Sequence, residues 1–278
     1  MPAKTRSRTD SRRCRSTAAG IAILTIRARG VHSHADVSAR DLPERMLILL
    51  VGHLAHQCRR VRGEASWQRA VIDYQQTYLA AAAWFVGLVE QVPADRWDAP
   101  GLGTWNLREL AGHTVSAGLR AVLASLAHPA SRCDMPSAGG YYALARIVDP
   151  AVYHAAIAAS GEDAKRAGEV LGDDPAGVLR PLLSAVTAAV TATEDGQLVE
   201  TRAGGMRVVD WLTTRTFELA VHGLDLAGAV EVPASPPKDV LADAVVLAAR
   251  VGVEVGDGTT VLLALTGRRA LPERFCVL

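Results

Sequence analysis

A polar stripe within an otherwise apolar helical pattern is the feature that most constrains this chain. Between Val209 and Leu226, helical spacing places five side chains on one face: Trp211, Arg215, Glu218, His222 and Asp225. Apolar residues flank that face: Leu212, Leu219, Val221, Leu224 and Leu226. Glu218 and His222 can direct an oxygen and a nitrogen at one point, which suits a divalent metal. The same spacing also occurs on solvated helix faces, so the pair alone leaves both interpretations open.

The composition favours a mainly α fold. The chain has 278 residues, enough for one large or two small domains with a sizeable core. Hydrophobic residues make up 49% of it but aromatic residues only 5%, so the apolar content is mostly Ala, Leu and Val. Such a mixture is typical of alanine-rich helical proteins.

Charge divides the chain into two parts. Residues 1–68 contain 13 Lys and Arg against 5 Asp and Glu, whereas the remainder contains 17 against 24. The first part has no sustained hydrophobic period and no secretory signal pattern, so we expect a disordered basic head. Its basic run could contact nucleic acid or anionic lipid. A solvated tail, or a start codon placed too far upstream, is the favoured interpretation.

Cysteine usage and hydropathy indicate a soluble protein of the cytoplasm. The four cysteines form no C-x-x-C pair, which argues against a disulfide framework or a cysteine zinc knuckle: Cys14, Cys58, Cys133 and Cys276. No apolar run approaches the roughly 20 residues that span a bilayer. We therefore expect no membrane partner.

Helical periodicity predicts a bundle of about four principal helices over residues 69–232. The expected helices are 71–91, 106–127, 141–147, 150–171, 176–193 and 209–226. Asn106 followed by Glu109 resembles a capping box at the start of the second of these. A small hairpin is expected between 198–202 and 206–208.

A proline-rich linker after Val232 separates a short C-terminal segment, residues 233–278. There we expect one helix over 240–251 and one strand over 260–265. The predicted architecture is thus a helix bundle followed by a small α+β segment.

His113 lies in the second turn of the helix that Asn106 begins, on its apolar side. A single histidine there is typical of a core residue, but bundle cores also hold metal ligands from facing helices. The segment from Trp105 to His113, together with Glu218 and His222, resembles the mycothiol-dependent maleylpyruvate isomerase family. The resemblance covers roughly residues 70–278 and implies a DinB-like four-helix fold. It also implies that His113, Glu218 and His222 bind the metal.

Two imidazoles and one carboxylate would form a three-ligand site with an open position, as in catalytic zinc sites. A cation there lowers the pKa of a bound thiol, and no protein cysteine is placed to supply that thiol. The resemblance implies mycothiol, whose thiolate would add to the cis double bond of a keto acid and leave after rotation. Another electrophile would make the enzyme a thiol transferase. Asp225 and Arg215 are either supports of the ligands or surface charge pairs.

Two alternatives stay open. The family draws an arginine from a fuller C-terminal domain, and neither Arg268 nor Arg269 is matched to it. Because DinB-like bundles need not retain activity, the protein could instead be a non-catalytic metal-binding or regulatory module. Nucleic-acid binding is disfavoured by the acidic body and the lack of an aromatic platform. The sequence predicts neither the substrate nor the oligomeric state.

Overall fold

A computed structural model of the protein describes residues 73–278, so the predicted basic head of residues 1–68 lies outside the described residues. The helices and strands, in chain order, are α2 (Tyr74–Val89), η1 (Ala94–Arg96), α3 (Leu107–Val115), η2 (Ser116–Arg120), α4 (Ala121–Leu126), α5 (Ala138–Ile147), α6 (Pro150–Glu169), α7 (Pro175–Thr191), β1 (Leu198–Thr201), β2 (Gly204–Arg207), α8 (Val208–Val230), α9 (Lys238–Glu254) and α10 (Gly258–Leu265). Within residues 73–278, none of the helices combines the length and the apolar character needed to cross a bilayer.

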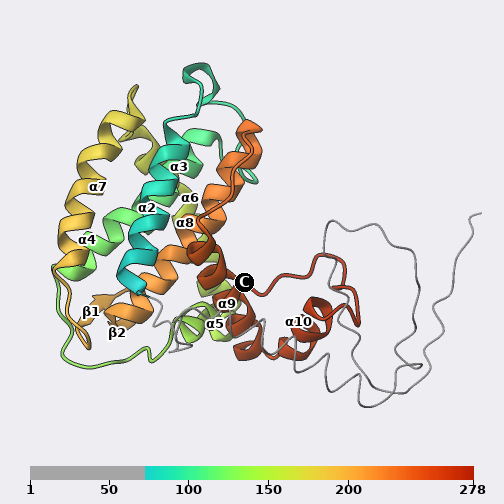
Figure 1. Ribbon diagram of the computed structural model, residues 1–278. Helices are drawn as coiled ribbons and strands as arrows, with labels where there is room; N and C mark the ends of the chain where they lie inside the picture. The colour runs from blue at the N-terminus through green and yellow to red at the C-terminus, as the bar shows by residue number, and fades with distance from the viewer. Residues whose placement is uncertain (1–72) are drawn as a thin grey trace, which may run out of the picture. The chain divides into compact units, whose positions relative to one another are not determined.

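Four principal helices form a closed bundle (Figure 1). Helix α2 packs against α7 and α8, and the continuous segment α3, η2 and α4 completes the ring by contacting α8 and α7. Helix α6 packs on the outside of α3, while α9 covers α8 and α5. The prediction of a mainly α fold built on a four-helix bundle is confirmed.

Local capping explains where several helices begin. The Asp73 side chain accepts hydrogen bonds from the amides of Gln75 and Gln76 at the start of α2. The predicted capping box of α3 is present: Asn106 Oδ1 accepts from the Glu109 amide at 2.8 Å, and Glu109 Oε2 accepts from the Asn106 amide at 3.0 Å. These caps fix where α3 begins and therefore which of its residues face the bundle.

The core is made of aliphatic side chains with a few aromatic rings, as the composition predicts. Its largest fully buried side chains come from all four bundle helices and their neighbours: Tyr78, Phe85, Leu107, Leu110, Leu119, Leu171, Leu179, Met206, Leu212, Leu219, Leu226 and Leu247. The apolar flanks predicted for α8 are therefore buried at three of five positions. Leu224, expected to contact the core, is instead 40% exposed.

Two glycines allow close helix contacts beside the candidate site. A Cβ on Gly112 would lie 2.2 Å from the backbone nitrogen of Gly168, so α3 and α6 cross backbone to backbone at this point. A Cβ on Gly223 would lie 2.3 Å from the Trp84 ring. The absence of a side chain at Gly223 therefore lets α2 pack closely against α8. These contacts fix the helix positions next to His113 and His222.

The helix predicted over 106–127 contains one turn of π-helix, η2, between α3 and α4. A π turn admits an extra residue into the helix and is frequently found at functional sites. Here Ser116, Ala117 and Arg120 of that turn line a cavity beside His113.

The predicted hairpin is confirmed, but the predicted C-terminal strand is wrong. Strands β1 and β2 pair antiparallel, with Leu198 opposite Arg207 and Thr201 opposite Gly204. Residues 260–265 belong instead to helix α10, which packs on α9. Leu262 to Leu265 favour a helix. Within residues 73–278 the only sheet is the pair β1 and β2, whose strands also form bridges to Pro129 and Met135, so a strand over 260–265 would lack a partner.

Candidate metal centre

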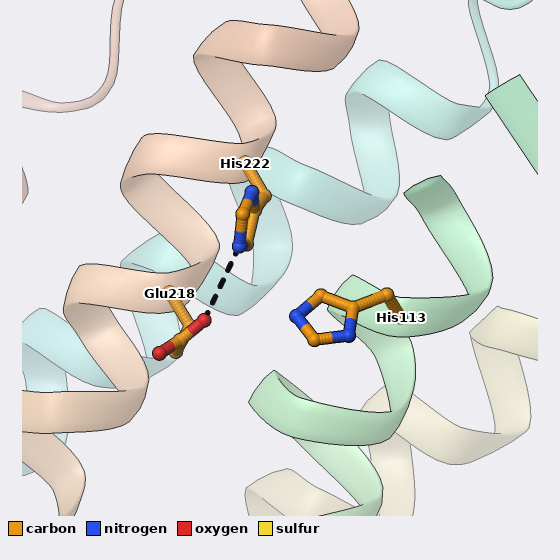
Figure 2. A group of neighbouring side chains, drawn as sticks. All are labelled: His113, Glu218 and His222. Carbon is orange, nitrogen blue, oxygen red and sulfur yellow. Dashed lines mark ion pairs between the residues drawn. The ribbon is translucent and has the colours of Figure 1, made fainter. Parts of the chain in front are cut away.

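The structure brings together the three residues that the sequence predicts as ligands. His113 comes from α3, and Glu218 and His222 come from successive turns of α8; Figure 2 shows all three side chains directed at the space between the two helices. One ligand atom from each residue lies within 4.8 Å of the others. All three side chains are partly buried. A single ion could contact all three after small side-chain adjustments.

His222 is held on both of its ring nitrogens. Its Nδ1 lies 3.0 Å from Asp225 Oδ2, and its Nε2 lies 3.4 Å from Glu218 Oε2. Burial alone would lower the pKa of His222, but the hydrogen bonds and charges of Asp225 and Glu218 outweigh it and raise the pKa to about 9. Because Asp225 accepts the Nδ1 proton, Nε2 is the nitrogen presented to a metal.

Glu218 is an ionised carboxylate in a partly buried position. Burial favours its neutral form, yet the hydrogen bond with His222, the Arg215 charge and the Tyr142 hydroxyl together lower its pKa to about 2. The Tyr142 hydroxyl donates to Glu218 Oε1 at 2.8 Å. An ionised carboxylate is the form that binds a metal, so no proton has to leave Glu218 near neutral pH.

His113 is the neutral histidine of the group. Its pKa is lowered first by burial and then by the positive charges of His222 and Arg215, although Glu218 opposes them. Its ring lies on Trp105, with centroids 4.7 Å apart, and meets the His222 ring edge-on at 5.1 Å. Trp105 and His222 therefore restrict the orientation of this imidazole from two sides.

The two residues proposed as supports, Asp225 and Arg215, both contact candidate ligands. Asp225 binds His222, as described above, and Arg215 Nη2 lies 3.9 Å from Glu218 Oε1. Arg215 is only 4% exposed and its guanidinium stacks on Trp211 at 4.1 Å and on Tyr141 at 5.3 Å. The surface-pairing alternative is therefore wrong for Arg215. Within residues 73–278, its Nη2 and Trp211 Nε1 are buried without a hydrogen-bond partner.

A cavity of about 570 Å³ opens beside the three residues and is lined by His113, Glu218 and Arg215 among others. This volume lies in the range of small-molecule sites. Its lining also includes charged side chains of both signs: Arg120, Asp163, Glu200 and Arg202. A ligand in this cavity would lie against His113 and Glu218, whereas His222 is not one of the lining residues.

Tyr142 is the residue that sequence reasoning missed. It comes from α5, 76 residues before Glu218, so no spacing rule connects the two. The only available signal was the paired Tyr141 and Tyr142 in a short helix among apolar residues, which does not indicate a carboxylate partner.

The fold and the donor set define a class: a four-helix bundle with two imidazoles and a carboxylate converging from facing helices beside a small-molecule cavity. Sequence comparison identifies the family. Residues 78–227 match the family model described as the mycothiol maleylpyruvate isomerase N-terminal domain, and the chain belongs to that family. Comparisons with curated proteins and with solved structures gave no significant match.

Proposed function

We propose that the protein is a metal-dependent enzyme that uses an external low-molecular-weight thiol, mycothiol, as its nucleophile. His113, Glu218 and His222 hold a divalent ion, with zinc the expected metal. The observation that carries the proposal is the convergence of these three donors beside a cavity of about 570 Å³, in a chain of this family. Borderline nitrogen donors with one carboxylate are a donor set that zinc favours.

The bound ion would stabilise the thiolate form of a thiol that enters the open coordination position. The protein residues prepare that position. Asp225 holds the His222 ring so that Nε2 faces the site, and Trp105 restricts His113. Because Glu218 is the single carboxylate among the three, a dication keeps one net positive charge for the thiolate.

The acceptor is a small electrophile. A conjugated keto acid with a cis double bond would be isomerised, since thiolate addition, rotation and elimination return the same atoms as the trans isomer. An electrophile with a leaving group would instead keep the sulfur, making the enzyme a thiol transferase. The cavity wall carries both basic and acidic side chains, so it does not select between these acceptors.

The test is turnover of a panel of keto acids and other electrophiles by the zinc-loaded protein, with and without mycothiol. We expect turnover that needs both mycothiol and metal, and its loss in His113→Ala and His222→Ala together with the zinc. Stoichiometric zinc with no thiol-dependent reaction across the panel would favour a non-catalytic metal-binding protein. Full zinc content in both variants would contradict the ligand assignment itself.

A further inference from the structure

The two oxygens of Glu218 have different surroundings. Oε2 faces the imidazoles and lies 3.4 Å from His222 Nε2. Oε1 is turned toward Tyr142, whose hydroxyl donates to it at 2.8 Å, and toward Arg215 Nη2 at 3.9 Å. One oxygen is therefore directed at the site, while a hydrogen bond and a positive charge hold the other.

The Tyr142 hydroxyl has a second acceptor within reach, the Thr214 carbonyl oxygen at 3.0 Å. A hydroxyl has one proton to donate, and the Thr214 carbonyl already accepts a hydrogen bond from the next turn of α8. Because Glu218 is charged, the hydrogen bond to its carboxylate is the stronger of the two. The proton therefore belongs mainly to Oε1.

The ring of Tyr142 is held as firmly as its hydroxyl. It packs edge-on to Tyr141 at 5.3 Å and against Phe217 at 5.2 Å, and its own helix α5 packs on α8 and α9. The phenol reaches Glu218 from a third element, separate from the two helices that carry the donors. Tyr142 is therefore not carried on either helix that bears a candidate metal ligand.

We propose that Tyr142 is a positioning residue that keeps Glu218 monodentate through Oε2, and so leaves the metal open to an external thiol. The inference rests on the proposed function. A carboxylate that binds through both oxygens would add a fourth protein donor to the three, and four-donor sites are typical of closed, structural zinc sites. Removing the hydroxyl frees Oε1 to rotate onto the metal and compete with the thiol.

The experiment uses full-length protein loaded with cobalt, whose visible spectrum reports coordination geometry, titrated with 2-mercaptoethanol. In wild type we expect a thiolate-to-cobalt charge-transfer band that saturates. In Tyr142→Phe we expect an altered visible cobalt spectrum before thiol is added. The thiol concentration at half-saturation should rise by about tenfold or more, the scale of losses from groups that orient metal ligands.

Tyr78→Phe is the matched control. It also deletes one buried tyrosine hydroxyl, which donates to the Gly118 carbonyl at 2.7 Å, but that hydroxyl contacts none of the three donors. It should lose stability while keeping the cobalt spectrum and thiol affinity of wild type. A Tyr142→Phe protein that matches wild type in both readouts overturns the role of Tyr142 and leaves the proposed function intact.

A wild-type protein that binds cobalt but shows no thiol band overturns the proposed function, and this inference with it. If Tyr142→Phe does not fold or does not hold cobalt, a structure of the zinc-loaded wild-type protein decides the question. Glu218 Oε1 bonded to Tyr142 and outside the coordination shell supports the inference. Both carboxylate oxygens bonded to zinc overturn it.

Discussion

His222 places its two ring nitrogens in different surroundings. Asp225 accepts from Nδ1, whereas Nε2 faces Glu218 across 3.4 Å. Without a metal, the proton on Nε2 forms the ion pair with Glu218. An ion at the site would take the place of that proton, so metal binding and protonation of His222 compete.

This competition predicts the pH dependence of metal affinity. The pKa of His222 is raised to about 9, that of Glu218 is lowered to about 2, and that of His113 is lowered below its ordinary value. Of these three candidate ligands, only His222 has a proton to lose between pH 7 and 8.5. The apparent zinc affinity should therefore rise about tenfold per pH unit and level off above about pH 9. Calorimetry in two buffers of different ionisation enthalpy should give about one proton released per zinc at pH 7.5.

Asp225→Asn supplies the control, because it removes one of the two carboxylates that raise the pKa of His222. The level region of the affinity profile should then begin at a lower pH. The unfolding free energy of the metal-free wild-type protein should fall as pH rises, whereas the zinc affinity should rise. A raised folded pKa gives stability that is present below about 6.5, the unfolded value, and is lost as pH rises through about 9. An affinity that is flat from pH 7 to 8.5 contradicts this account of His222.

At the scale of helices, the crossing of α3 and α6 places His113. Gly112 precedes His113 in the chain, and a Cβ there would lie 2.2 Å from the Gly168 backbone nitrogen. Since backbone atoms cannot rotate away as a side chain can, Gly112→Ala should push α6 from α3. We expect a loss of about 1–3 kcal/mol in unfolding free energy, the usual cost of overpacking. Zinc affinity should fall as well, and thermal denaturation and zinc titration measure the two effects.

Gly87→Ala is the matched substitution, because Gly87 is also helical but has no atom within 4 Å of an added Cβ. It should stabilise the protein by about 0.5–1 kcal/mol through helix propensity and leave zinc affinity unchanged. Equal stability for the two variants would show that the α3–α6 contact relaxes freely.

The helices of the bundle could be predicted because their sequence signals are local. Apolar periodicity, Asn106 with Glu109, and the Asp-Pro starts of α6 and α7 act within one or two turns. The π turn over Ser116–Arg120 could not be predicted, since it depends on how α3 and α4 pack against other helices. The sequence predicts a strand in place of helix α10 because Thr260 and Val261 favour strands, and because spacing alone does not show that a partner strand is absent.

The residues of the candidate site also differ in whether local sequence signals predict them. Glu218, His222 and Asp225 share one helix, so their spacing alone places them on one face. His113 is predicted only by the family resemblance, and the structure places it beside the other candidate ligands. Tyr142 approaches from α5 and could be found only from the packed structure, because tertiary contacts are not encoded in spacing.

At the scale of the whole molecule, residues 73–278 supply every helix of the bundle ring and all three candidate ligands. Deleting residues 1–68 also spares Asp73, whose side chain caps α2. We therefore propose the boundary predicted from sequence, near residue 69, as the start of the metal-binding domain. The truncated protein should keep the thermal midpoint and zinc content of the full chain, measured by calorimetry at matched metal loading.

A longer deletion, of residues 1–77, is the control for this test, because it should lower the thermal midpoint. It removes the Asp73 cap and also Gln75, whose side-chain amide donates to the Thr193 hydroxyl at 2.7 Å and to the Thr193 carbonyl at 3.1 Å. These hydrogen bonds join α2 to the segment that follows α7. A lost cap costs about 1 kcal/mol and each lost hydrogen bond about 0.5–1.5 kcal/mol, so this deletion should lower the thermal midpoint by several degrees. If deletion of residues 1–68 lowers the midpoint as much, the proposed boundary is wrong and the domain begins earlier in the chain.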